Sequence, residues 1–470
     1  MKMVRSAAIA ALMAVLPALS HAAQLDGGQL SVVWGIPFAG LLLSIALMPL
    51  LFPNFWHHHF GKVTAAWSLA FLIPLLAIYG VDAAVANFVH ALLAEYVPFV
   101  ILLTALYVVA GGIYIRGSLT GTPLLNTAIL AIGAVLASFM GTTGASMLLI
   151  RPLIRANAHR ARVVHIVVFF IFIVSNAGGS LTPLGDPPLF LGFLKGVDFS
   201  WTLLHIWPQA LFLVGALLLI FLVLDTWLSK HDSQQLPIRE SEQAREAIGF
   251  DGKLNFIWLG AIIGLVLLSG LWKSSVVFDV AGTEVGLPGV VRDVGLLAVA
   301  LLSLVLTPKA VHANNQFGWG PMQEVAKLFA GIFLTIIPVI AMLKAGVDGP
   351  FAAIVRAVTN PDGSPNTTMY FWATGALSSF LDNAPTYLVF FNTAGGDPAV
   401  LMTALAPTLV AISSGAVFMG ANSYIGNAPN LMVKAIAEDR GVRMPSFFGY
   451  MLWSVGILVP LFVVMTFIWF

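Results

Sequence analysis

The sequence predicts an all-α polytopic membrane protein, built as an inverted repeat with two re-entrant hairpins and two broken transmembrane helices. Hydrophobic residues make up 59% of the 470 residues and charged residues only 9%, which leaves too little polar surface for a soluble globule. Apolar runs long enough to cross a bilayer recur along the whole chain. In addition, one series of helix breakers occurs twice, once in each half.

The two copies of the breaker series align without a gap at a spacing of 241 residues. Gly179 then falls on Gly420, and Pro188 falls on Pro429. Because transporters bind their cargo where helices are interrupted in both halves, this duplication indicates a secondary transporter. The first copy reads ASFMGTTGASMLLI at 137–150 and SNAGGSLTPLGDPPLF at 175–190, and the second reads SSFLDNAPTYLVFF at 378–391 and FMGANSYIGNAPNL at 418–431.

The chain opens with a segment typical of a signal peptide, which we predict over residues 1–23. Lys2 and Arg5 precede an apolar run at 7–19, and the Ser-His-Ala at 20–22 suits a signal peptidase. The run is too short to span a membrane well. Whether the segment is removed or kept, the chain emerges outside, so we expect the mature N-terminus on the outer side.

The spanning helices are predicted from apolar runs of about 20 residues or more. Two further runs, 124–150 and 367–391, are broken at 141–144 and 382–385. We interpret them as re-entrant hairpins, whose tips must be buried in protein or face water. The predicted spans are 30–52, 63–82, 97–115, 163–197 (broken), 202–227, 254–272, 293–307, 325–343, 400–435 (broken) and 447–469.

The distribution of basic residues supports this topology. Of the 22 lysines and arginines, 15 fall in loops assigned to the cytoplasm and five in outer loops, as the positive-inside rule requires. Each half then makes five crossings, and an odd number turns the second half upside down relative to the first. We expect repeat one at 24–228, a cytoplasmic linker with a short helix at 229–253, and the inverted repeat two at 254–470.

Two carboxylates lie deep in the predicted membrane region, where a charged group costs roughly 3 kcal/mol and is usually functional. Under the inverted symmetry each belongs to its own site, and oxygen ligands with one negative charge suit a small monovalent cation such as sodium. Site one comprises Asp186, Asn176, Ser138, Thr142, Thr143, Thr182 and the carbonyls at 178–183, and site two comprises Asp382, Asn383, Asn422, Asn427 and the carbonyls at 423–426.

Helix capping is the alternative role for several of these residues. Asp186 is followed by two prolines, and Asn383 and Asn427 each lie two residues before one, as expected at the start of a half-helix. Asp382, next to Asn383, shares this alternative. For Asn176 the alternative is an interhelical hydrogen bond.

Three further features are weaker candidates. The histidines at 57–59 resemble a metal site, but consecutive residues on a loop do not converge on one ion. His90 and Glu95 lie in a segment that suits an amphipathic interfacial helix, and they are candidates for a proton relay. Arg151, at the end of the first hairpin, either meets an anionic substrate or anchors the hairpin at the cytoplasmic face.

The order of hairpin, basic loop, SNAGGSLTPLGDPP and a second copy with SSFLDNAP and GANSYIGNAPN resembles the ion-transporter superfamily. That group includes D-type sodium/proton antiporters, citrate-metal-proton symporters and sodium-coupled dicarboxylate carriers. The resemblance implies a homodimer in the bacterial inner membrane, in which a scaffold holds a mobile domain of hairpins and broken helices. Where dicarboxylate carriers have Ser-Asn-Thr triplets at the hairpin tips, this chain has Gly-Thr-Thr at 141–143 and Asp-Asn-Ala at 382–384.

These observations favour sodium(cation)/proton antiport by alternating access, because one buried carboxyl group that takes either a proton or a cation can exchange them. Sodium and protons would be the transported or coupling ions, with no other cofactor. Symport of citrate or a dicarboxylate with sodium or protons is the alternative, since half-helix N-termini bind carboxylates without basic side chains. The sequence has no HExxH or GxSxG motif and no basic block, so we expect neither an enzyme nor a nucleic-acid partner.

Overall fold

The computed structural model describes residues 25–117, 119–231 and 249–470. These residues are mostly helical, and seven of their helices are long and apolar enough to cross a membrane. The number is eight if α13 (Gly320–Thr335) and α14 (Ile337–Lys344), which meet at 41°, form one bent span. A polytopic helical membrane protein is thus confirmed, whereas the predicted signal peptide and most of the predicted linker lie outside the described residues.

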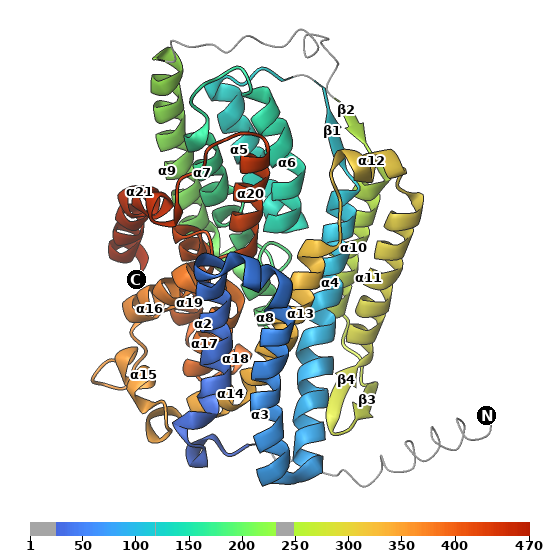
Figure 1. Cartoon of the computed structure of the whole chain (residues 1–470). Helices are drawn as coiled ribbons and strands as arrows, with labels where there is room; N and C mark the ends of the chain where they lie inside the picture. Colours follow the sequence, from blue (N-terminus) through green and yellow to red (C-terminus); the bar gives the residue numbers. More distant parts are fainter. Residues whose placement is uncertain (1–24, 118, 232–248) are drawn as a thin grey trace, which may run out of the picture.

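Six helices form a group that we call the frame helices, four of which, α3, α4, α10 and α11, stand next to one another on the right of Figure 1. Within this group α2 packs on α3, α3 packs on α13, and α4 packs on both α10 and α11. A π-helical segment, Ala91–Tyr96, joins α3 directly to α4. We define the frame helices as α2 (Ile36–Leu51), α3 (Pro53–His90), α4 (Val97–Gly111), α10 (Leu254–Leu271), α11 (Leu287–Leu306) and α13.

The central helices pack against the frame and come from both halves of the chain. Almost every residue of α7 and α19 is buried, as expected for helices that are apolar on all sides. In contrast, only 22% of the most apolar window of α9 (Trp201–Lys230) or α21 (Phe447–Trp469) is buried, which suits contact with lipid. We define the central helices as α5 (Pro123–Met140), α6 (Thr142–Ala156), α7 (Val164–Ile173), α8 (Pro187–Leu194), α16 (Thr367–Phe380), α17 (Asn383–Thr393), α19 (Ala406–Met419) and α20 (Ala428–Asp439).

Two helix pairs occupy the positions predicted for the hairpins. The first pair, α5 and α6, is joined at Gly141, whose φ of 80° lies in the left-handed region that favours glycine. The second pair, α16 and α17, is separated only by Leu381 and Asp382, and its two helices also pack together. Both chain reversals therefore fall at the predicted breaks.

The two predicted broken helices are interrupted in the same way. A short 3₁₀ turn and an irregular stretch separate α7 from α8, and the same arrangement separates α19 from α20. At the end of the first stretch, a Cβ on Gly185 would lie 2.2 Å from the carbonyl oxygen of Gly179; on Gly426 it would lie 2.5 Å from that of Gly420. Glycine is therefore required at both positions by close approach of the backbone.

Several predicted boundaries were wrong. Helix α3 begins at Pro53 rather than residue 63, so the histidines at 57–59 are helical and not on a loop. This helix breaks at Gly80, where φ is 83°, close to the predicted end at 82, and helical structure then continues to α4. The predicted span 325–343 is divided into α13 and α14, and the start of the 400–435 run lies in a separate short helix, α18 (Pro398–Met402).

Four short strands and two short helices were not predicted. The strands β1 (Tyr114–Arg116) and β2 (Gly249–Asp251) pair antiparallel, with Tyr114 opposite Asp251. This β1–β2 ribbon connects the end of α4 to the start of α10 and therefore joins the two halves of the chain. The strands β3 (Val277–Val280) and β4 (Thr283–Gly286) form a second antiparallel ribbon, and the short helices are α12 (Lys309–Asn314) and α15 (Ala352–Ala357).

Candidate ion and substrate site

Asp186 lies at the first break, immediately before α8, and its side chain is buried. Thr142 Oγ1 donates a hydrogen bond to Asp186 Oδ1 at 3.0 Å. Asn427 Nδ2 donates to the same oxygen at 3.1 Å, and Asn383 Nδ2 donates to Asp186 Oδ2. Asp186 stands at the N-cap position of α8, but its side chain makes no capping hydrogen bond to that helix and faces these three donors instead.

The donors to Asp186 come from both halves of the chain. Thr142 begins α6 and Asn383 begins α17, so each stands at the tip of a hairpin. In the alignment of the two repeats, Thr142 corresponds to Asn383, and Asp186 corresponds to Asn427. The equivalent residues Thr142 and Asn383 therefore both donate to Asp186, and so does Asn427, the residue equivalent to Asp186 itself.

Buried asparagines extend this network between the two broken helices. Besides contacting Asp186, Asn427 Nδ2 donates to Asn176 Oδ1 at 3.2 Å. Asn176 Nδ2 donates to Asn430 Oδ1 at 2.7 Å, and Asn430 Nδ2 donates to the carbonyl oxygen of Gly420 at 2.9 Å. Asn176 thus makes the interhelical hydrogen bond that was its alternative role, and it connects the first break to the second.

Hydroxyl groups support both breaks with the same hydrogen bonds. In the first half Ser138 Oγ donates to the carbonyl oxygen of Gly178 at 2.5 Å, while Thr182 Oγ1 donates to that of Ser138. In the second half the residues 241 positions later repeat both bonds: Ser379 Oγ donates to the carbonyl oxygen of Met419 at 3.1 Å, and Ser423 Oγ donates to that of Ser379. Ser138 and Thr182 hold the backbone and do not contact Asp186.

Asp382 occupies the position that Gly141 has in the first hairpin. It is half-buried, and its Oδ1 accepts a hydrogen bond from the backbone nitrogen of Ala384 at 3.0 Å, which makes it the N-cap of α17. Asn422, which was assigned to the same site, donates instead to Ser379 Oγ at 2.9 Å. Thr143 is half-buried next to Thr142.

The structure therefore distributes the predicted site residues differently from the two separate sites expected. Asn383 and Asn427 were assigned to Asp382, but both donate to Asp186, because the hairpin tip and the break of the second half meet the first half at the centre of the molecule. Among the described residues, no group of three or more His, Asp or Glu side chains could hold a metal ion. A cation at this centre would be held by a carboxylate with amide and hydroxyl oxygens.

A second buried carboxylate, Asp225, was missed. It lies on α9 and is completely buried. Arg160 Nη2 donates to Asp225 Oδ1 at 2.5 Å, His165 Nε2 lies 2.8 Å from the same oxygen, and Asn126 Nδ2 donates to Oδ2 at 3.0 Å. Asp225 stands two residues before the predicted end of its helix, where a carboxylate is expected to lie near the membrane surface, so the pattern gives no signal for it. These partners connect α9 to α5 through Asn126, to the segment before α7 through Arg160, and to α7 itself through His165.

Of the two candidates for a proton relay, Glu95 takes part in an ion pair, and that pair acts electrostatically on His90. Glu95 lies in the π-helical segment and is buried, and its Oε1 pairs with Lys195 Nζ at the end of α8. Lys344, at the end of α14, acts electrostatically on the same pair. This ion pair therefore links the frame helices to the central helices at the end of α8 away from Asp186.

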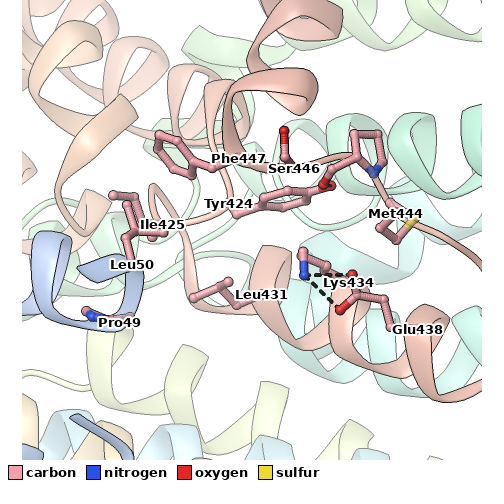
Figure 2. Close-up of a pocket in the computed structure, with 11 residues that line it drawn as sticks. Pro49, Leu50, Tyr424, Ile425, Leu431, Lys434, Glu438, Met444, Ser446 and Phe447 are labelled. Atoms are coloured by element: carbon pink, nitrogen blue, oxygen red, sulfur yellow. Dashed lines mark hydrogen bonds and ion pairs between the residues drawn. The ribbon is translucent and has the colours of Figure 1, made fainter. Parts of the chain in front are cut away.

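A cavity of about 430 Å³ reaches the second break from the side of α2 (Figure 2). Tyr424 and Ile425, in the break itself, form part of its wall. Lys434 Nζ lies 5.6 Å from the centre of the Tyr424 ring and pairs with Glu438 at 2.7 Å. Because Lys434 and Glu438 neutralise each other, the two charged residues in the cavity wall add no net charge to it.

The apolar helices around a buried polar centre define a polytopic membrane protein. Residues 27–470 match a family described as "Putative citrate transport". Since the match covers nearly the whole chain, the protein belongs to this citrate transport family, which is a family of transporters and not of enzymes. A comparison with curated proteins found no match.

Proposed function

We propose that this protein is a secondary transporter that carries citrate or a related carboxylate together with protons or a small cation. The family favours this function, which was the alternative from the sequence, over the sodium/proton antiport expected first. The observation that carries the proposal is the position of Asp186, a buried carboxyl group that receives hydrogen bonds from both hairpin tips and from the opposite break.

The proposal includes an inverted repeat with two re-entrant hairpins that works by alternating access. It is supported by the hydrogen bonds that recur at the same spacing in both halves. It is also supported by the meeting of four helix N-termini, those of α6, α8, α17 and α20, around Asp186 and its donors. Such N-termini attract negatively charged groups, so they suit a carboxylate substrate without a basic side chain.

Asp186 is suited to bind the coupling proton or cation. Among the described residues no Lys or Arg forms an ion pair with it, and a buried carboxylate without a cation is costly. A proton or a small cation removes that cost. Once protonated, the Asp186 carboxyl group can itself donate a hydrogen bond, and Asn383 Oδ1, which has no partner among the described residues, is the acceptor next to it after the amide rotates. The second hairpin tip would then respond to the protonation of Asp186.

Transport by purified protein in proteoliposomes tests this function. We expect labelled citrate to accumulate under an inward proton or sodium gradient, and we expect Asp186→Asn to lower its uptake roughly 100-fold. Asp198→Asn, at an exposed carboxylate beyond α8, is the matched control and should transport like the wild type. If sodium or lithium alone releases protons, as followed by a pH-sensitive dye, and citrate is not transported, the protein is an antiporter and this proposal is wrong.

A further inference from the structure

Arg151 is a buried cation without a carboxylate partner among the described residues. It lies on α6 and is 8% exposed. The other buried arginines are paired, Arg160 with Asp225 at 2.5 Å and Arg292 with Asp293 at 2.7 Å. A buried guanidinium that lacks a counter-charge is costly, so its presence calls for an explanation.

The hydrogen bonds of Arg151 are also incomplete. Its Nε and Nη2 both donate to one oxygen, Oε1 of Gln316, at the long distances of 3.4 and 3.3 Å. Its Nη1 is buried and has no partner in the described part of the chain. Gln316 itself is exposed, and its φ of 50° places it in the left-handed region. The guanidinium of Arg151 therefore has N–H groups without an acceptor, and its one hydrogen-bond partner is exposed to solvent.

The charged groups near Arg151 do not neutralise its guanidinium. Arg440 and Asp439, at the end of α20, both act electrostatically on the guanidinium, and so does Tyr107 of α4. The Tyr107 hydroxyl group donates to the carbonyl oxygen of Gly318 at 2.7 Å, so it stays neutral while making that bond. Two arginines thus face one carboxylate, and an added anion would balance the set.

This place is distinct from the network around Asp186. Arg151 follows Thr142 by nine residues, which corresponds to about 13 Å along a helix. Helix α6 packs against α4 here, and Gln316 follows α12, so the guanidinium lies where the central helices meet the frame. Arg151 lies five residues before the end of α6, on the side of the membrane predicted to be cytoplasmic.

We propose that Arg151, assisted by Arg440, is an entry subsite that binds one carboxylate group of the substrate at the end of α6 remote from Asp186. A guanidinium with free donors matches the two oxygens of a carboxylate better than an ammonium group does. The assignment of the anion as a carboxylate substrate rests on the proposed function. An anionic lipid headgroup has the same oxygen chemistry, and the experiment separates the two sources by using neutral lipid.

The test measures initial rates of citrate transport from each face of the protein in oriented proteoliposomes of phosphatidylcholine. We expect Arg151→Gln to raise KM about tenfold for citrate offered on the face where α6 ends, with kcat within a factor of about two, as for the loss of one charged hydrogen bond in binding. KM on the opposite face should not change. Arg151→Lys keeps the positive charge but loses the paired N–H donors of the guanidinium, so it should give an intermediate KM.

Two matched variants guard against a structural explanation. Arg155→Gln removes a cation one turn further along α6, where it bonds Tyr114 Oη at 3.2 Å and the carbonyl oxygen of Ile115 at 3.0 Å, and it should leave KM unchanged. Gln316→Ala removes the hydrogen-bond partner of Arg151 and keeps the guanidinium, so KM should stay the same or fall. Size-exclusion and thermal unfolding profiles of all variants should match those of the wild type.

The proposal is overturned if Arg151→Gln lowers kcat at constant KM, since Arg151 would then act on the conformational change, or if the KM effect appears only in anionic lipid. Equilibrium binding of labelled citrate and of labelled sulfate separates this proposal from the proposed function. If the wild type does not transport citrate but binds either anion in an Arg151-dependent way, the proposed function fails and the anion subsite stands. If neither anion binds, the subsite fails as well.

Discussion

Asp186 and Asn427 stand at equivalent positions of the two repeats, yet only one of them is a carboxylate. Their side chains share a hydrogen bond of 3.1 Å. Two carboxylates at this distance would not both ionise, whereas an amide opposite a carboxylate donates to it. The difference between Asp and Asn therefore leaves one carboxylate, and not two, in this hydrogen-bonded pair.

The equivalence of the two positions leads to an exchange experiment. Asp186→Asn should lower proton-coupled citrate uptake roughly 100-fold, the equivalent of about 2.7 kcal/mol. Adding Asn427→Asp returns a carboxyl group to the same hydrogen-bonded pair from the opposite repeat. We expect the double variant to recover a measurable part of the uptake of labelled citrate. If the double variant folds but is as inactive as Asp186→Asn, the carboxyl group is needed at position 186 itself, and a carboxyl group anywhere in the hydrogen-bonded pair is not enough.

At the scale of elements, the two breaks depend on the close approach of one backbone stretch to another. Gly185→Ala would place a methyl group 2.2 Å from the carbonyl oxygen of Gly179. Because backbone atoms cannot move aside like a flexible side chain, we expect a loss of about 1–3 kcal/mol and a lower melting temperature in detergent. The control is Gly215→Ala on α9, where no atom lies within 4 Å of the added Cβ and the unfolding temperature should not fall. Equal melting temperatures would contradict the role given to Gly185.

The sequence predicted the breaks well and the contacts between halves poorly. Glycine and proline determine where a helix stops, so Gly141 and the interruption before Asp186 could be read directly. The start of α3 was hidden because the histidines at 57–59 interrupt the apolar pattern. The bonds of Asn383 and Asn427 to Asp186 were assigned within one half, because helical periodicity carries no information on which helix faces which.

At the scale of the whole molecule, Glu95 and Lys195 connect the frame helices to the central helices. Alternating access requires the central helices to move relative to the frame, so this ion pair would have to separate in each cycle. The chain contains no cysteine, which allows a direct test. In the variant Glu95→Cys/Lys195→Cys, a bifunctional methanethiosulfonate reagent that joins the two cysteines should stop citrate transport, and a reducing agent should restore it.

The control for that experiment is a second ion pair that lies within the β1–β2 ribbon. Arg116 Nε is 3.4 Å from Asp251 Oδ1, and both residues are attached to frame helices. The same reagent applied to Arg116→Cys/Asp251→Cys should therefore leave transport unchanged. Undiminished transport by the cross-linked Glu95→Cys/Lys195→Cys variant would show that the two groups of helices do not separate at this place.

The hydrogen bonds of Asp186 also constrain how the two repeats can diverge in evolution. Its partners Asn383 and Asn427 lie 197 and 241 residues further along the chain. A substitution at either asparagine changes the surroundings of a carboxyl group that lies in the other half of the chain. We therefore expect a change at one of these three positions to be tolerated only together with a compensating change in the other half.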